Sequence, residues 1–225
     1  MISSIQANLS KVLGQLAPLG PVQLVAVSKM KSVADIKEAY DAGQRHFGEN
    51  YVAELVDKAH QLPEDIQWHF IGHLQSNKAR MLIDGGVNLY MIESVDSLKL
   101  ANKLESVLSS SNRRVKILVE VHTSEEDTKS GVSPLSAPNL VNHILKTCPH
   151  LEFFGLMTIA DPKCPETSFQ KLSDLKKALE KTGLPVPILS MGMSDDYAAA
   201  IAYGSNQVRI GSSIFGSRYY CNLYI

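Results

Sequence analysis

The sequence predicts a single (β/α)8 barrel, and three observations support this fold class. Short apolar stretches recur eight times in 225 residues, and segments with helical spacing separate them. No internal repeat, low-complexity segment or long linker marks a second domain, so residues 1–225 are expected to form one unit. The apolar stretches lie near residues 23–28, 45–48, 67–72, 88–93, 115–121, 152–157, 187–191 and 207–210. A doubly wound open sheet is the alternative that the same alternation allows.

A helix within residues 1–20 is expected to precede the barrel and to pack on its outside. Its apolar side chains recur at helical spacing and share one face: Ile5, Leu9, Val12, Leu13 and Leu16. Pro18 and Gly20 end this helix. At the other end of the chain, residues 219–225 form an expected tail.

The segment 33–42 predicts the first helix of the barrel itself. Ser32 precedes it and Asp35 follows three residues later, a spacing that resembles a capping box. Gly43 can close the helix at its carboxyl end. The expected buried stripe consists of Val33, Ile36, Ala39 and Tyr40.

Two later segments show the same helical spacing. One is lined by Leu98, Ala101, Leu104 and Leu108. The other is lined by Phe169, Leu172, Leu175 and Leu179. Gly183 and Pro185 end this second helix. Strands that alternate with such helices predict parallel βαβ units.

The overall composition is that of an ordinary globular protein. Lys and Arg number 22 against 23 Asp and Glu, a formal net charge of −1, which gives no electrostatic argument for nucleic acid or membrane binding. No apolar run approaches the roughly 20 residues that span a bilayer. Nothing in the sequence requires a dimer, so a monomer is expected.

The cysteines and the N-terminus bear on the cellular compartment. Three cysteines with no CxxC pair disfavour a disulfide framework and favour a reducing compartment. The first residues lack the basic-then-apolar order of a secretory signal. We therefore expect a cytoplasmic protein. Mitochondrial import is the alternative, because no acidic residue precedes Asp35.

Lys29 stands at the end of the first apolar stretch and is the strongest candidate for chemistry. A lysine where a buried strand ends costs free energy unless its amine is paired, solvated or neutral for a reaction. Strand alternation places Val25, Val27 and Lys29 on one face, with Leu24 and Ala26 on the other. In a barrel, Lys29 would lie at the carboxyl-terminal mouth, where its amine could condense with an aldehyde. A lysine that only emerges into solvent is the alternative.

Arg209 lies between two apolar residues of the last apolar stretch. If Val208 and Ile210 pack against helices, Arg209 points into the barrel, where an unpaired guanidinium is costly. It therefore needs a partner inside the barrel. That partner is either an anionic or acceptor group of a ligand, or a barrel carboxylate such as Glu49 or Glu120.

Glycine and serine follow the last two strands, where (β/α)8 barrels commonly bind phosphate. Gly211 and Ser212 open a short turn, and Ser194 is placed to cap a helix that runs toward Tyr203. Backbone N–H groups at two neighbouring helix starts could bind a phosphate group. Together with Lys29, these residues suggest a site for a phosphorylated aldehyde cofactor. Ordinary helix capping is the alternative for Ser194.

Two other clusters are weaker candidates. His69 and His73 are four residues apart, as metal ligands on a helix would be, but their segment has the pattern of a strand, which would not align them. No metal site is expected, and His73 could instead line the mouth of the pocket. The polar run 124–131 is expected to be a surface loop, so its Lys129 is a poor candidate for a Schiff base.

The motifs in their order resemble the family of pyridoxal phosphate homeostasis proteins, which is related in fold to the N-terminal barrel of alanine racemase. The resemblance runs from about Val22 to Arg218. The matching stretches are 25-VAVSK-29, 47-FGENYVAE-54, 68-WHFIGHLQSNK-78, 153-FFGLMTI-159, 189-LSMGMSDD-196 and 205-SNQVRIGSSIFGSR-218.

This resemblance implies pyridoxal 5′-phosphate as a cofactor, held as an internal aldimine on Lys29. Arg209 matches the arginine that the family places at the pyridine nitrogen. The family's phosphate-binding positions match Ser194, Gly211 and Ser212. Its other positions around the cofactor match Asn50, His73 and Met157. No catalytic residue is assigned by this match.

The residues also bear on turnover. Arg209 cannot give up a proton, so it cannot keep the pyridine nitrogen protonated, and a neutral pyridine is a poorer electron sink. In alanine racemase, whose barrel this sequence resembles, a tyrosine from the second domain of a partner subunit acts on the far face of the aldimine, and we expect no such domain after Arg218. We therefore expect a protein that buffers or delivers the cofactor, with apo-forms of pyridoxal-phosphate enzymes as expected partners.

Two enzymatic alternatives stay open at this stage. One is a single-domain amino-acid racemase that uses a Tyr or His of the barrel as its second base. The other is a class I aldolase that uses Lys29 directly on a sugar phosphate, without a cofactor. The aldolase would be colourless as purified, whereas a pyridoxal aldimine is yellow.

Overall fold

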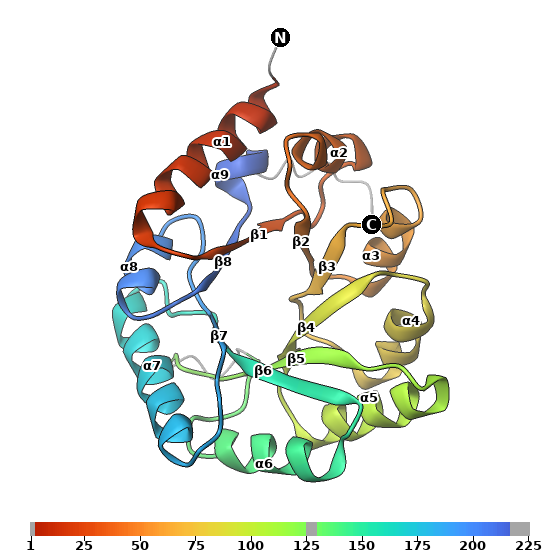
Figure 1. Cartoon of the computed structure of the whole chain (residues 1–225), viewed down its shortest axis with the longest axis vertical. Helices are drawn as coiled ribbons and strands as arrows, with labels where there is room; N and C mark the ends of the chain where they lie inside the picture. Colours follow the sequence, from red (N-terminus) through yellow and green to blue (C-terminus); the bar gives the residue numbers. More distant parts are fainter. Residues whose placement is uncertain (1–2, 125–129, 217–225) are drawn as a thin grey trace.

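The computed structural model describes residues 3–124 and 130–216, and these form one closed barrel of eight parallel strands. The strands are β1 (Gln23–Val27), β2 (His46–Glu49), β3 (Gln67–Phe70), β4 (Leu89–Val95), β5 (Val115–Glu120), β6 (Leu151–Met157), β7 (Ile188–Ser190) and β8 (Gln207–Ile210). Each strand pairs with its sequence neighbours, and β1 closes the ring against β8 (Figure 1). The predicted fold class is confirmed, and the open sheet is excluded.

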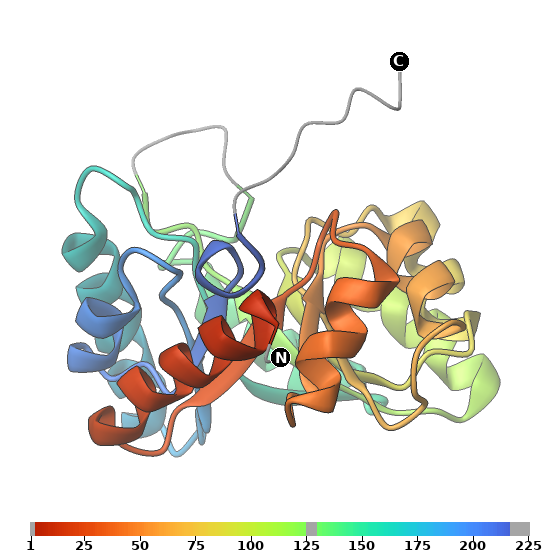
Figure 2. The ribbon, with the colours of Figure 1, turned by 90° about the horizontal axis from the view of Figure 1, so that it is seen from above.

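Helices cover the outside of the barrel (Figures 1 and 2). They are α1 (Ser4–Leu16), α2 (Val33–Asp41), α3 (Val52–Ala59), α4 (Ala79–Asp84), α5 (Leu98–Ser111), α6 (Ala137–Thr147), α7 (Pro165–Lys181), α8 (Tyr197–Ala202) and α9 (Ser212–Phe215). Two short 3-10 turns, Ala17–Leu19 and Ser76–Lys78, complete the regular structure of the described residues. Within this part of the chain, no helix is both long and apolar enough to cross a membrane.

The predicted N-terminal helix is α1, which packs beside α9 and α2 (Figure 1). Its buried residues are Ile5, Leu9, Val12 and Leu16. The Asn8 amide donates to the Ile214 carbonyl at 3.1 Å, which ties the first helix to the last. Leu13, which the sequence analysis placed on the same face as these residues, is 42% exposed. The tail 219–225 lies outside the described residues.

Both predicted ends of α2 are confirmed. Ser32 caps α2 through a capping box with Asp35, and Gly43 follows the helix with a φ of +101°. In α5, the expected stripe is buried except for Leu98, which is 50% exposed. Leu98 is the first residue of the helix, directly after the cap Ser97.

The interior of the barrel differs from the layer between strands and helices. The outer layer is a continuous apolar core. Inside the barrel, a small apolar layer of Met91, Leu118 and Met157 lies alongside buried polar residues. A buried polar group needs a hydrogen-bond partner, so the positions of these polar groups define what the barrel can bind.

Candidate functional site

A cavity of about 270 Å³ opens at the carboxyl-terminal ends of the strands. Its walls come mainly from the residues that follow β1, β2, β7 and β8. Six of the eight site residues predicted from the sequence line it: Lys29, Asn50, Ser194, Arg209, Gly211 and Ser212. Chain segments far apart in the sequence therefore bring an amine, a guanidinium group and hydroxyl groups into one space.

Lys29 follows β1 and is half-buried at the wall of this cavity. The alternation predicted for β1 is confirmed by its neighbours. Leu24 and Ala26 belong to the outer core, whereas Val27 lines the cavity together with Lys29. Val25 lies against Gly48 on the inner face. The strand thus delivers the lysine amine to the mouth of the barrel.

Arg209 lies inside the barrel, with only 5% of its surface exposed. Its Nη1 donates to Ser190 Oγ at 2.6 Å, and its Nη2 donates to the Thr158 carbonyl at 2.8 Å. Burial lowers the pKa of Arg209, whereas the negative charges of Glu93, Glu120 and Asp196 raise it. The guanidinium is therefore fixed at the cavity wall before any ligand arrives.

Glu49 was a wrong choice as the partner of Arg209. It lies on the face of β2 that points toward α3, and it pairs with Lys58 at 2.7 Å. Glu120 is 4% exposed and close enough to affect Arg209 electrostatically. Burial and the charge of Asp96 raise the pKa of Glu120 to about 7.

The carboxylate that the sequence reasoning missed is Glu93 of β4. It accepts from His69 Nδ1 at 2.6 Å, Ser190 Oγ at 2.7 Å and Gln207 Nε2 at 2.8 Å. His69 in turn contacts His46 through its Nε2 at 2.9 Å. Burial favours the neutral acid, but the His69 hydrogen bond and the charges of His69 and Arg209 outweigh it, so the pKa of Glu93 is lowered. A chain of polar side chains thus runs from the cavity into the barrel.

Ser194 lines the cavity, but the prediction that it caps α8 is wrong. The cap residue of α8 is Asp196, and Asp196 Oδ1 accepts from the Met193 N–H at 2.6 Å. This N–H lies before the helix, and the Asp196 side chain makes no capping hydrogen bond to α8.

Gly211 and Ser212 mark the start of α9 at the edge of the cavity. A Cβ atom at position 211 would lie 3.2 Å from the Val27 carbonyl oxygen, so glycine lets the end of β8 approach β1 closely. Ser212 is exposed and lines the mouth. The first turn of any helix carries N–H groups without intrahelical acceptors.

Asn50 follows β2 and carries a buried Oδ1 atom with no hydrogen-bond partner among the described residues. The segment that follows β3 passes close to Asn50 at Gly72, where a Cβ atom would lie 2.2 Å from the Asn50 carbonyl oxygen. The backbone of Asn50 is therefore fixed by its surroundings. Its orphaned side-chain oxygen is available to a donor group in the cavity.

Comparison with known proteins agrees with this geometry. The family model of the alanine racemase N-terminal domain matches residues 2–219. A pyridoxal phosphate homeostasis protein of Schizosaccharomyces pombe is 46% identical over 203 residues, which are 88% of this chain and 84% of that protein. The protein of the same name from Homo sapiens is 46% identical over 213 residues, 88% of this chain and 77% of that protein. The chain belongs to the family of pyridoxal phosphate homeostasis proteins.

A solved structure of this fold contains the cofactor. PipY of Synechococcus elongatus, with PLP bound, resembles the chain with a TM-score of 0.84 at 35% identity. The match covers 94% of this chain and 100% of that chain. The family resemblance read from the sequence motifs is thus confirmed at the level of both sequence and fold.

Two of the residues that the family resemblance singled out do not line the main cavity. His73 is exposed, lies 3.2 Å from Asp96 and from Ser130, and borders an adjoining cavity of about 340 Å³ that also touches Asn50. Met157 is fully buried beside Met91. Their roles toward a cofactor stay predictions.

The remaining sequence candidates have different outcomes. His69 lies inside the barrel while His73 lies outside it, so the two do not converge as ligands. No cluster of three or more metal-ligating side chains occurs in residues 3–124 and 130–216. Lys129 lies outside the described residues.

Proposed function

We propose that this chain binds pyridoxal phosphate in the cavity, covalently as a Schiff base on Lys29, and that it buffers and delivers this cofactor with little turnover of its own. The observation that carries the proposal is the convergence of Lys29 and the buried Arg209 on one cavity. The PLP bound in PipY and the names of the relatives support it. Apo-forms of pyridoxal-phosphate enzymes are the proposed recipients, and the protein is proposed to act in the cytoplasm as a monomer.

The groups around the cavity fit this cofactor chemically. An amine suits the aldehyde, and a fixed guanidinium suits the pyridine nitrogen as an acceptor. Hydroxyl and backbone donors of Ser194, Gly211 and Ser212 suit the phosphate. The orphaned Asn50 Oδ1 offers an acceptor for a ring hydroxyl. When bound, pyridoxal phosphate supplies an electrophilic aldehyde carbon and an electron-withdrawing ring.

Lys29 performs the covalent step in this proposal. Its deprotonated amine attacks the aldehyde carbon, a C–N double bond forms, and the aldehyde oxygen leaves as one molecule of water. Release reverses the step, either by water or by an incoming amine that takes the place of Lys29. A carrier needs only these exchanges.

Arg209 limits what else the site can do. It donates to an acceptor but cannot give up a proton near neutral pH, so a nitrogen opposite it stays unprotonated. The ring is then a weak electron sink, which disfavours removal of the α-hydrogen of an amino acid. Ser190 accepts from the Arg209 guanidinium and donates to Glu93. These two residues fix the orientation of the guanidinium but do not line the cavity themselves.

Borohydride reduction tests the proposal. The protein, loaded with pyridoxal phosphate, should lose its visible absorbance on reduction and carry a pyridoxyl group on Lys29 in peptide mass mapping. Lys31 is the matched control, since it lines the same cavity but donates to the Phe215 and Gly216 carbonyls at 3.0 and 3.1 Å. Lys29→Ala should abolish the label and Lys31→Ala should keep it. A pyridoxyl group found mainly on another lysine would sink the proposal.

The phosphate subsite has its own test. Ser194→Ala combined with Ser212→Ala should weaken retention of pyridoxal phosphate, because each charge-assisted hydrogen bond contributes about 1.5–3 kcal/mol. Unphosphorylated pyridoxal should bind equally well to the variant and to the parent protein. Equal losses for both compounds would show that these serines do not contact phosphate.

Isotope exchange distinguishes the proposed carrier from the racemase alternative. The loaded protein is incubated with L-alanine in deuterated water, and the α-hydrogen is followed by NMR. We expect slow exchange, because Arg209 leaves the ring nitrogen unprotonated. Rapid exchange with inversion at the α-carbon would contradict the carrier proposal and support a racemase.

A further inference from the structure

The turn that carries Lys29 has an unusual backbone conformation. The Lys31 N–H donates to the Ser28 carbonyl at 3.0 Å and closes a four-residue turn. Met30, the third residue of this turn, has a φ of +60°. Elsewhere in residues 3–124 and 130–216, the only other non-glycine residue with positive φ is Asn112, at the end of a helix. A side chain such as that of methionine rarely adopts this conformation unless the surroundings hold it.

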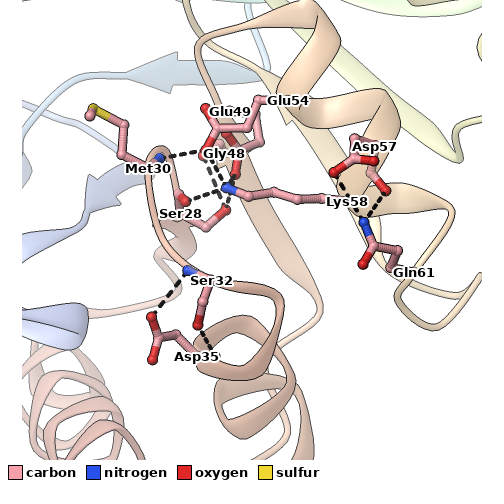
Figure 3. A network of polar contacts seen from close by, with 10 residues as sticks. All are labelled: Ser28, Met30, Ser32, Asp35, Gly48, Glu49, Glu54, Asp57, Lys58 and Gln61. Atoms are coloured by element: carbon pink, nitrogen blue, oxygen red, sulfur yellow. Dashed lines mark hydrogen bonds and ion pairs between the residues drawn. The ribbon is translucent and has the colours of Figure 1, made fainter. Parts of the chain in front are cut away.

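Two side chains of α3 contact this turn (Figure 3). Lys58 Nζ donates to the Ser28 carbonyl at 2.8 Å, and Glu54 Oε1 accepts from the Met30 N–H at 2.6 Å. These two groups belong to the peptide units on either side of Lys29. The two contacts therefore hold the backbone on both sides of the Lys29 Cα atom.

Lys58 is built into a buried cluster of charges. It is 5% exposed, and its amine lies 2.6 Å from Glu54 and 2.7 Å from Glu49. Ser28 Oγ also donates to Glu49 Oε1, at 2.7 Å (Figure 3). Burial raises the pKa of Glu49 to about 7, against the opposing effect of Lys58. A lysine is rarely buried so completely, and here its position serves the turn.

None of these charged residues lines the cavity. We propose that Lys58 and Glu54 are positioning residues that clamp the Lys29 turn and thereby set how long the cavity retains pyridoxal phosphate. This inference rests on the proposed function. It assigns to α3 a role that neither the cavity lining nor the sequence motifs indicate.

The physical reason is that the cofactor would be attached at two places. The covalent attachment is on the loop after β1, whereas the proposed phosphate donors follow β7 and β8. Both attachments are satisfied together only if the separation between the two loops is fixed. A turn released from the clamp would relax at Met30 and move the Lys29 amine relative to the phosphate donors.

The experiment uses two variants of the clamp and two matched controls. Lys58→Met and Glu54→Ala remove its two hydrogen bonds to the turn. Glu54 is 23% exposed at its side chain, so its variant keeps the test informative where Lys58→Met does not fold. Lys37→Met and Asp41→Ala break the exposed ion pair of α2, which has the same i,i+4 spacing and does not touch the turn.

Two quantities are measured on each full-length variant. The first is the hydrogen exchange of the Met30 amide in the protein without cofactor. The second is the rate at which bound pyridoxal phosphate leaves, followed by its absorbance in the presence of a trapping amine. In both clamp variants, Met30 exchange should accelerate and release should be on the order of tenfold to a hundredfold faster. Both controls should behave like the parent protein.

The outcomes separate the clamp from the proposed function. If the parent protein bound no pyridoxal phosphate, the proposed function would fail, while Met30 exchange would still report whether the clamp exists. An unchanged Met30 exchange rate in Lys58→Met and Glu54→Ala would overturn the clamp. Faster exchange combined with unchanged release would show that the clamp does not control retention, which also overturns the inference.

Discussion

Two buried glutamates lie near the candidate site, and they are paired differently. Glu93, inside the barrel, has both carboxylate oxygens occupied by donors from His69, Ser190 and Gln207. Glu49, between β2 and α3, has one oxygen in contact with Lys58 and Ser28, and its other oxygen has no partner in the described part of the chain. The pKa of Glu93 is lowered, whereas burial raises that of Glu49 to about 7.

Because the two side chains are equally buried, the difference between their pKa values comes from their partners. Both glutamates have 0% of their surface exposed. Three donors and the nearby Arg209 keep Glu93 ionised against its desolvation cost. The cation beside Glu49 is Lys58, which Glu54 shares, and it does not offset the desolvation cost of an ionised Glu49. The interior of the barrel is therefore a fixed charge arrangement, while the cluster beside the Lys29 turn is only partly ionised at neutral pH.

Glu93→Gln is expected to have the largest effect on stability. The amide turns one acceptor atom into a donor that faces existing donors, and it removes the first of the three negative charges near Arg209, leaving those of Glu120 and Asp196. Removing one partner of a buried pair costs about 3–5 kcal/mol, which urea denaturation at pH 7 should show. Because the folded pKa of Glu93 is lowered, its contribution is present above the unfolded value of 4.5 and is lost as the pH falls further. A loss below about 1 kcal/mol at pH 7 would contradict the fixed arrangement.

The same substitution at Glu49 is expected to have the opposite sign. The folded pKa of about 7 lies above the unfolded value of 4.5, so ionisation of Glu49 opposes folding as the pH rises between these values. Gln resembles the protonated acid. Glu49→Gln should therefore match the parent protein at pH 4, and at pH 8 it should be more stable by up to about 3 kcal/mol. Denaturation curves of both proteins at the two pH values measure this difference, and a destabilised variant at pH 8 would refute it.

Much of this architecture could be predicted from local sequence patterns. The eight apolar stretches correspond to the eight strands, and the positions of Lys29 and Arg209 followed from strand alternation. Alternation is a local property that tertiary contacts did not override in β1 and β8. The capping box at Ser32 was predictable for the same reason.

The partners of the buried charges could not be predicted in this way. Glu93 occurs in the apolar run 89-LYMIESV-95. Its charge, next to the apolar side chains of Met91 and Ile92, is the only sign in the sequence that it points inward. Two of its donors, Ser190 and Gln207, come from strands far away in the sequence, and β4 has an irregular register against β5. Glu49 was assigned to the wrong partner because nothing in the sequence alone places Lys58 in contact with it. Long-range pairing depends on barrel closure, which local patterns do not encode.

The smallest expected effect concerns Met30, whose turn lies against the Glu49 cluster. Met30 is 54% exposed, so Met30→Gly loses little packing. Relief of the left-handed conformation should gain about 1–2 kcal/mol, and the entropy of glycine should cost about 0.5–1 kcal/mol. The net gain in the free energy of unfolding should be about 0.5 kcal/mol. Asn112→Gly is the control, because asparagine already tolerates its φ of +49° and should gain less.

The same substitution should gain less when the clamp is absent. Without the hydrogen bond from Lys58, the turn can relax at Met30 and lose part of its strain, so the benefit of glycine in the Lys58→Met protein should be smaller than its benefit in the parent protein. Urea denaturation of the parent, the two single variants and the double variant gives this coupling free energy. Strictly additive effects would mean that the charged cluster and the Lys29 turn are energetically independent. The partly ionised cluster would then be a packing feature of α3 alone, and the contrast with Glu93 would carry no consequence for the lysine.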